Sequence, residues 1–274
     1  MTRNPIVSLE ALVARIPDGA LLAVPKDGSG VAMAATRELV RRRVRDLHLL
    51  CVPTGGIQAD ILIGAGAVRT LETSAITLGE FGAAPRFIEA VRSGAIRIKD
   101  ATCPAIYAAL QAGEKGLPFM PLRGLIGSDV LAHRADWKVI DNPFSTGDPI
   151  VVLPALRPDF ALFHAPLGDR FGNVFVARQR ELMTMAHAAR CTLVSVEQIT
   201  NDNLLEDAAR AGSVLPAIYV SGLAEARRGA WPLGLWDLYP DDDAALARYV
   251  DLSRTRDGFE RFLDEWMGQA RAVA

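Results

Sequence analysis

The chain has 274 residues, of which 50% are hydrophobic and 23% charged, and its 30 basic and 32 acidic residues leave a net charge of −2. This composition is typical of a globular protein and excludes collagen-like, coiled-coil and disordered chains. The balanced charge argues against a nucleic-acid partner held by bulk positive charge. No apolar run reaches the roughly 18 residues of a membrane span, so no membrane partner is expected.

The 3 cysteines and 4 histidines are too scattered for a disulfide framework or a zinc site, and we expect no bound metal. The segment Met1–Pro5 lacks the apolar stretch of a secretory signal. We therefore expect a cytoplasmic protein with reduced thiols.

Helical and strand patterns alternate in the first part of the chain. Ser8 is a candidate N-cap of the first helix, and Gly94 is placed to end a later one. A further short element starts at 60–63. The pattern predicts helices at 8–15, 31–43, 84–93 and 102–111, and strands at 20–24, 47–52 and 68–76.

The second part begins with segment 117–149, which contains 4 prolines and is expected to be a long irregular loop with a function or an interface. Residues 173–177 are expected to form a hairpin with the strand before them. The run 191–196 is apolar on both faces, as in an interior strand, and the last helix is expected to break near Gly258. The other predicted elements are strands at 150–153 and 160–164 and helices at 181–189, 204–212 and 244–270.

This alternation predicts an α/β fold with an open, largely parallel sheet flanked by helices. No linker divides the chain, so we predict one domain over residues 1–274. Folds of this class bind ligands at the carboxyl ends of the strands.

Two glycine-containing loops follow predicted strands. Gly28, Ser29 and Gly30 precede a helix whose free N–H groups can hold a phosphate or carboxylate, although the same residues can simply form a tight turn. Gly55 and Gly56 would let a substrate approach the backbone closely. Both loops are candidate ligand-binding sites.

Other candidate residues with reactive side chains are more isolated in the sequence. Glu80, between two glycines, is either an acid or base or a solvated loop residue. Cys103 begins a helix whose dipole would lower its thiol pKa, but without a nearby base we interpret it as inert and buried. Gly127 and Ser128 lie in the long loop, where the hydroxyl could donate to an acyl oxygen, and His164 is interpreted as a core histidine.

Several segments between about residue 8 and residue 266 form a recognisable set. They are Gly55–Gly66, Gly116–Pro121, Asp141–Phe144, Gly147–Asp148, Val152, Pro154–Ala155, Asp159, His164–Ala165 and Gly172–Val174. Together they resemble the A (alpha) subunit of the family I coenzyme A transferases, most closely of the glutaconate type.

The resemblance implies an enzyme that moves coenzyme A between an acyl-CoA and a carboxylic acid. It implies coenzyme A as a co-substrate, no permanently bound cofactor, and, for a partner, a B (beta) subunit. In the family a glutamate carboxylate forms anhydride and thioester intermediates, and in two-chain members it belongs to the B subunit. The corresponding loop here carries Pro53, which cannot be a nucleophile. The partner's site is therefore expected to open against Gly55, Gly56, Glu80, Gly127 and Ser128.

The sequence also departs from the family pattern. Val24, Pro25 and Lys26 stand where a Gly-Gly-Phe motif is usual, so acyl or coenzyme A recognition is expected to differ. Related steroid-ring-opening hydrolases use a glutamate at about the position of Cys103, so the match does not support their chemistry. Two alternatives stay open: a thioester or C–C bond hydrolase of the same fold with Glu80 as base, and a non-catalytic ligand sensor or scaffold.

Overall fold

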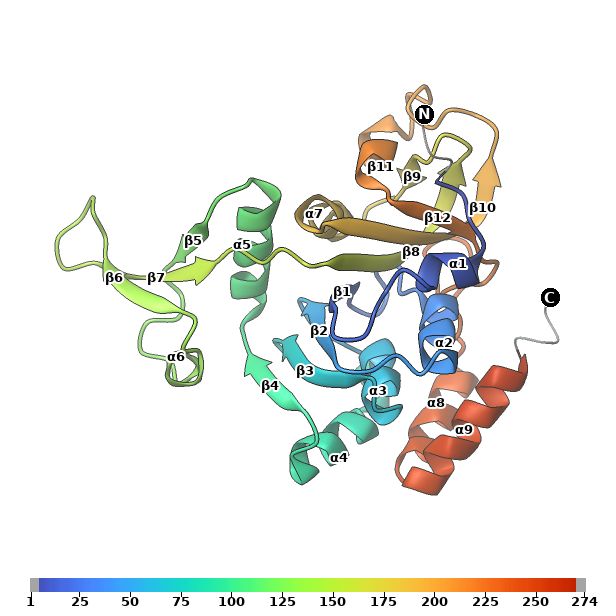
Figure 1. Cartoon of the computed structure of the whole chain (residues 1–274), viewed down its shortest axis with the longest axis horizontal. Coiled ribbons are helices and arrows are strands. Elements are labelled where there is room, and N and C mark those ends of the chain that lie inside the picture. Colours follow the sequence, from blue (N-terminus) through green and yellow to red (C-terminus); the bar gives the residue numbers. More distant parts are fainter. Residues whose placement is uncertain (1–4, 270–274) are drawn as a thin grey trace.

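A computed structural model describes residues 5–269, and its largest element is a nine-stranded sheet (Figure 1). Strands β12, β10, β8, β1, β2, β3 and β4 pair in that order, and each of these pairs is parallel. Strands β9 and β11 extend it with antiparallel pairs. The sheet comprises β1 (Leu21–Pro25), β2 (Leu47–Val52), β3 (Val68–Thr73), β4 (Arg97–Asp100), β8 (Phe160–Asp169), β9 (Val174–Phe175), β10 (Cys191–Thr200), β11 (Val214–Leu215) and β12 (Gly222–Glu225).

Helices cover both faces of this sheet, which confirms the predicted α/β class (Figure 1). Helices α5 and α7 pack together on one face, while α1, α2 and α3 cover the other. The helices are α1 (Leu9–Val13), α2 (Met33–Arg41), α3 (Ile57–Gly64), α4 (Pro85–Ser93), α5 (Cys103–Glu114), α6 (Val130–His133), α7 (Arg180–Ala188), α8 (Asp243–Ser253) and α9 (Arg256–Gln269), with short 3-10 turns η1 (Gly79–Phe81), η2 (Ala211–Ser213) and η3 (Ala217–Tyr219).

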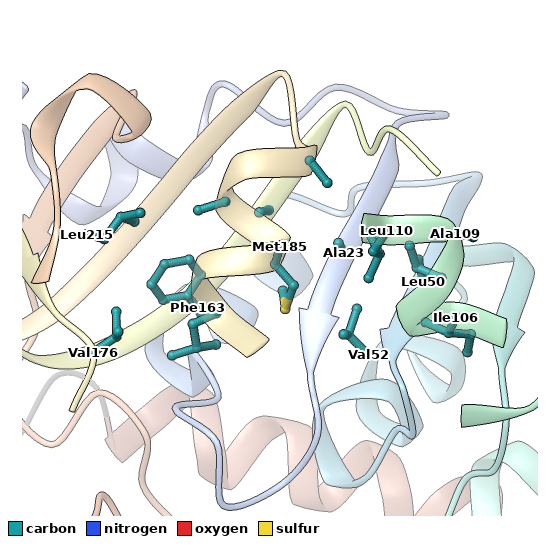
Figure 2. Close-up of a cluster of buried hydrophobic side chains, with 14 of the residues drawn as sticks. Ala23, Leu50, Val52, Ile106, Ala109, Leu110, Phe163, Val176, Met185 and Leu215 are labelled. Atoms are coloured by element: carbon teal, nitrogen blue, oxygen red, sulfur yellow. The ribbon is translucent and has the colours of Figure 1, made fainter. Parts of the chain in front are cut away.

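The alternation of side-chain direction along each strand explains why there is a hydrophobic core on both faces of the sheet. Successive side chains of a strand point to opposite faces. In β1, Ala23 packs toward α5 and α7, whereas Leu22 and Val24 pack toward α1 and α2. Figure 2 shows the first of these cores, in which Phe163 and Met185 lie among aliphatic side chains.

A second, smaller sheet stands off to one side of the main sheet (Figure 1). It contains β5 (Phe119–Leu122), β7 (Pro149–Pro154) and β6 (Lys138–Asp141), all antiparallel. We call residues 117–154 the arm. The predicted long irregular loop therefore contains two short strands and the short helix α6, which the sequence does not predict, while more of its residues lie outside helices and strands than within them.

A buried ionic cluster fastens the arm to the main sheet. Arg134, which follows α6, is 3% exposed and donates from Nη2 to Oε1 of Glu72 in β3 at 2.7 Å. Its Nη1 donates to the carbonyl of Asp100 at 2.9 Å. Burial alone would raise the pKa of Glu72, but a hydrogen bond from His48 and the charges of Arg134 and Lys99 outweigh it and lower that pKa.

The predicted helix at 204–212 is also wrong. Residues 204–210 form turns, and only the short η2 follows. Asn203 Oδ1 accepts from the N–H of Leu205, and Asp207 Oδ1 accepts from the N–H of Ala209. Such local bonds give the backbone an alternative to the helical ladder.

Most other boundaries agree with the sequence predictions to within a few residues. Ser8 caps α1, Gly94 ends α4 in the left-handed region, and β9 forms the expected hairpin with β8. The element at 60–63 belongs to α3, and the break in the last helix falls at 254–255, before Gly258. Residues 1–4, which contain most of the segment examined for a secretory signal, and residue 270, the predicted end of the last helix, lie outside the described residues.

None of the helices in the described part of the chain combines the length and the apolar character that crossing a bilayer requires.

Candidate functional site

A pocket of about 520 Å³ lies at the carboxyl ends of β1 and β2. The residues that follow these strands form one side, η1 forms a second, and α8 with the segment before it forms a third. Three of the predicted site residues, Gly28, Gly55 and Glu80, line this pocket together. Its lining also includes Lys26, Asp27, Ile57, Phe81, Leu233, Asp241, Asp243, Leu246 and Tyr249.

The two adjacent glycines after β2 make room for side chains of this chain. A Cβ on Gly56 would lie 1.9 Å from Oδ2 of Asp27, and one on Gly55 would lie 2.4 Å from Cδ1 of Ile76. Because no real side chain tolerates such distances, glycine is required at both positions. The result is that Asp27 reaches across from β1 to the start of α3.

Asp27 has one satisfied oxygen and one unsatisfied oxygen. Oδ2 accepts a hydrogen bond from the N–H of Ile57 at 3.0 Å. Oδ1 is sealed from solvent and has no hydrogen-bond partner among the described residues. Burial, helped by the nearby charge of Asp241 and opposed by the Ile57 bond, raises the pKa of Asp27 to about 7. The carboxyl group therefore changes protonation state near neutral pH.

A second buried aspartate holds the wall of the pocket together. Asp60 of α3 accepts hydrogen bonds from the N–H of Phe87 at 2.6 Å and from the hydroxyl of Tyr249 at 2.6 Å. It thereby joins α3, α4 and α8, and burial raises its pKa. Tyr249 is fully buried and lines the pocket.

Gly28, Ser29 and Gly30 form a turn whose residues face different ways. Gly28 lines the pocket, with φ of +76°. Ser29 is buried and donates to Oε1 of Glu181 at 2.8 Å, on α7. Gly30 packs against the backbone of His164, and its carbonyl accepts from the N–H of His164 at 2.7 Å.

The N–H groups at the start of α2, the predicted anion holder, are partly used within the chain. Met33 N–H donates to the carbonyl of Val31, and Ala34 N–H donates to the carbonyl of Gly229.

Glu80 is exposed at the mouth of the pocket, within η1. It makes no hydrogen bond or ion pair with the described residues, so its carboxylate is free to meet a ligand.

Gly127 and Ser128 lie elsewhere, between β5 and α6, outside the lining of this pocket. The Ser128 hydroxyl is buried without a hydrogen-bond partner among the described residues. The structure therefore does not bring these two residues together with Gly55 and Glu80.

Cys103 is exposed, so the expectation of a buried cysteine is wrong. It is the first residue of α5, at the carboxyl edge of the sheet, where the start of a helix remains open to solvent. Its Sγ lies 3.1 Å from Oγ of Ser74, which also donates to the carbonyl of Pro53 at 2.8 Å.

His164 is a satisfied core residue, as the sequence predicts. It is 0% exposed, and its ring nitrogens lie 2.9 Å from Ser195 Oγ and 2.8 Å from Glu197 Oε1. The same carboxylate accepts from the hydroxyl of Tyr239 and the N–H of Arg228. Although Ser195, His164 and Glu197 have the composition of a catalytic triad, Ser195 is also 0% exposed, and the group instead ties residues 228–239 to β8 and β10.

The sequence interpretation does not include Asp27, Asp241 or Tyr249. Asp27 carries a usable signal, because it is a carboxylate two residues after the end of β1 and directly before a glycine turn. Asp241 comes close to the rest of the lining only through the fold, and Tyr249 resembles one more apolar residue of a helix. The described residues contain no cluster of three or more His, Cys, Asp or Glu side chains that could hold a metal ion.

Three comparisons relate the chain to known proteins. The family profile "Coenzyme A transferase" matches residues 6–223. The A-type chain of the 3-oxoadipate CoA-transferase from Pseudomonas knackmussii is 31% identical over 265 residues, covering 94% of this chain and 91% of that protein.

Among solved structures, the glutaconate coenzyme A-transferase of Acidaminococcus fermentans superposes with a TM-score of 0.88 at 25% identity, covering 96% of this chain and 88% of that one. The decarboxylase AibA/AibB gives a TM-score of 0.84 at 31% identity, covering 96% and 98%.

Proposed function

Since this chain belongs to the coenzyme A transferase family, in which it is an A-type subunit, we propose that it forms half of the active site of a heteromeric enzyme. The enzyme moves coenzyme A between an acyl-CoA and a carboxylic acid. Coenzyme A is its co-substrate, and a B-type subunit is its partner. The reactive glutamate belongs to that partner.

The end of β2 carries this proposal. The family resemblance places the nucleophile of the partner subunit in the loop that corresponds to residues 51–55 here. In this chain Pro53 stands at that position, next to Thr54 and Gly55, which line the pocket. Because proline has no nucleophilic group, this loop does not supply the nucleophile, which supports a reactive glutamate on another chain.

We assign the lining residues supporting roles. Gly28, where a Cβ would have nothing within 4 Å, gives a bound acyl-CoA close access to the backbone, and Gly55 lines the same pocket while its missing side chain leaves room for Ile76. Glu80, free and exposed at the mouth, is the carboxylate of this chain that is best placed to exchange a proton with a substrate. Ser29, Gly30 and Gly56 shape these loops from behind. Gly127 and Ser128 can contribute only if the partner bridges the distance from the arm.

The arm is the surface that we assign to the B-type subunit. It stands off from the main sheet (Figure 1) and carries several exposed apolar side chains. Phe144, between β6 and β7, is 94% exposed. Side chains of this kind on a protruding element are typical of interfaces between subunits. The exposed apolar residues of the arm are Leu117, Phe119, Ile126, Val139, Ile140 and Phe144.

An exchange assay tests the proposal. The chain is purified alone and together with the B-type subunit that is found with it in its source, and each sample is given an acyl-CoA and a panel of carboxylic acids. We expect new acyl-CoAs from the complex and none from the chain alone. Exchange by the chain alone would contradict the assigned roles.

The same assay separates the alternatives. Free coenzyme A released without an acceptor acid, and lost in Glu80→Gln, would instead indicate a hydrolase. Release of CO₂ would indicate the type of reaction that the name of the decarboxylase AibA/AibB describes. A folded complex with no activity toward any acyl-CoA would favour a sensor or scaffold.

A further inference from the structure

The pocket beside Gly55 has an unusual balance of charges. Four carboxylates line it, whereas Lys26 is the basic side chain among the described lining residues. The Lys26 ammonium lies 4.0 Å from Oε1 of Glu181 and so faces a carboxylate of its own. The four lining carboxylates are Asp27, Glu80, Asp241 and Asp243.

The rest of the lining is largely apolar. Leu78, Phe81, Leu233, Leu246 and Val250 come from η1, from α8 and from the segments before them. The volume of about 520 Å³ is within the usual range for small-molecule sites. The cavity can therefore take an aliphatic chain, but a negative charge at the far end of that chain would meet the carboxylates of Glu80, Asp241 and Asp243, which have the same sign.

Asp27 offers no hydrogen-bond donor for a charged group on a ligand. Oδ1 of Asp27 is sealed from solvent and lacks a hydrogen-bond partner among the described residues, so a ligand in the cavity does not reach that atom. A carboxylate at the far end of an acyl chain only accepts hydrogen bonds, whereas a hydroxyl group both donates and accepts and adds no charge.

We propose that this pocket receives the acyl end of the substrate and selects acyl groups whose far end is uncharged, such as one that ends in a hydroxyl group. The proposal rests on the proposed function, because it assumes an acyl-CoA as the ligand. It predicts a substrate class different from the dicarboxylic acids in the names of the 3-oxoadipate and glutaconate enzymes.

A matched pair of ligands tests this selection. 5-Hydroxypentanoyl-CoA and glutaryl-CoA have the same chain length and differ at the far end, where one has a hydroxyl group and the other a carboxylate. Their dissociation constants are measured by calorimetry on the complex of this chain with its B-type subunit. We expect the hydroxyacyl ligand to bind at least about tenfold more tightly.

Charge variants locate the selectivity in this pocket. Glu80→Lys reverses an exposed charge that makes no bond with the described residues, so the fold should survive, and we expect the ratio of the two constants to fall severalfold. Asp241→Asn should also lower the ratio of the two constants. Glu260→Gln is the matched control, because Glu260 pairs with Arg256 on α9 outside the pocket, and it should leave the ratio unchanged.

The outcomes separate this inference from the function on which it rests. Equal or tighter binding of glutaryl-CoA, no binding of either ligand, or a ratio that the two pocket variants leave unchanged would overturn the inference. An exchange assay on the same samples reports on the function. Selective binding without any exchange would support the assignment of the pocket and would contradict the proposed transferase activity.

Discussion

Asp27 occupies a position in which the sequence, the backbone and the electrostatics depend on one another. It reaches the N–H of Ile57 only because Gly56 has no side chain. The same burial that places it there disfavours its negative charge and raises its pKa to about 7. Below that pH the native protein holds a proton that the unfolded chain, with a pKa of about 3.9, has already lost.

This difference predicts how Asp27 affects stability. Wild-type stability should decrease as the pH rises from about 4 to about 7, because the native state binds the extra proton there. Asp27→Asn cannot ionise, so its free energy of unfolding should increase relative to that of the wild type across that range. Because the residue is partly exposed, we expect a gain on the order of 2 kcal/mol, below the full value of the pKa shift. The charged or titratable groups that face Asp27 are Lys26, Cys51, Glu80, Asp241, Asp243 and Tyr249.

Urea unfolding of both proteins at pH 4.5, 6 and 8 measures this gain. Asp251→Asn, which removes an exposed carboxylate that pairs with Arg254, is the control and should show no such trend. A stability difference between Asp27→Asn and wild type that is the same at all three pH values would rule out titration of Asp27.

Among the elements, helices α8 and α9 show how one glycine permits a close crossing. A Cβ on Gly258 would lie 2.1 Å from the carbonyl oxygen of Leu252, whereas a Cβ on Gly268, in the same helix, would have nothing within 4 Å. These helices bury Tyr249 and Trp266 against α2 and α3. Their junction therefore sets the position of the pocket wall.

The two glycines predict opposite effects of the same substitution. Gly258→Ala should destabilise the protein by about 1–3 kcal/mol, because the new methyl group displaces α8. Gly268→Ala should stabilise it by about 0.5–1 kcal/mol, the usual difference between glycine and alanine in a helix. Urea unfolding of both variants and the wild type at one pH measures these two changes in stability. A stabilised Gly258→Ala variant would mean that the crossing is looser than the structure shows.

Individual elements also show where sequence patterns are sufficient to predict the bounds of a helix or strand. β2 and α4 are predicted almost to the residue, because a strong apolar run and a proline with a terminal glycine mark their ends. The sequence does not predict β4, because its four residues are mostly exposed and polar and so lack an apolar pattern. Two strands of the arm, β5 and β6, escape prediction because the prolines around them are typical of a loop.

The candidate site is predictable only in part. Gly28, Gly55 and Glu80 follow strands, and parallel strands bring such residues to one edge. The contribution of α8 is not predictable, because Asp241 and Tyr249 reach the pocket across nearly the whole length of the chain. The role of Asp27 requires the knowledge that Gly56 leaves space for it.

At the scale of the whole molecule, the arm and the pocket each have a feature that a partner subunit would complete. The arm exposes apolar surface, while the pocket lacks a nucleophile at Pro53. The proposed B-type subunit, which would contact the arm and supply a glutamate, would account for both features. The ionic cluster of Arg134 and Glu72 would keep the arm in a fixed position relative to the pocket.

Phe144 gives a direct test of the arm. Phe144→Ser should weaken the complex at least about tenfold and leave the melting temperature of the isolated chain nearly unchanged, because the ring is 94% exposed. Ile218→Ser, which removes an 86% exposed apolar residue from η3, is the matched control. Titration of each variant with the B-type subunit gives the affinities. An equal loss in both variants, or none in Phe144→Ser, would place the interface elsewhere.

The most direct test of the division of roles is to locate the covalent intermediate. The complex is incubated with an acyl-CoA, the glutamyl thioester is trapped by borohydride reduction, and both chains are digested and mapped by mass spectrometry. We predict that the modified glutamate lies on the B-type subunit, with no modified residue on this chain. A modified residue on this chain, at Glu80 or anywhere else, would contradict the account.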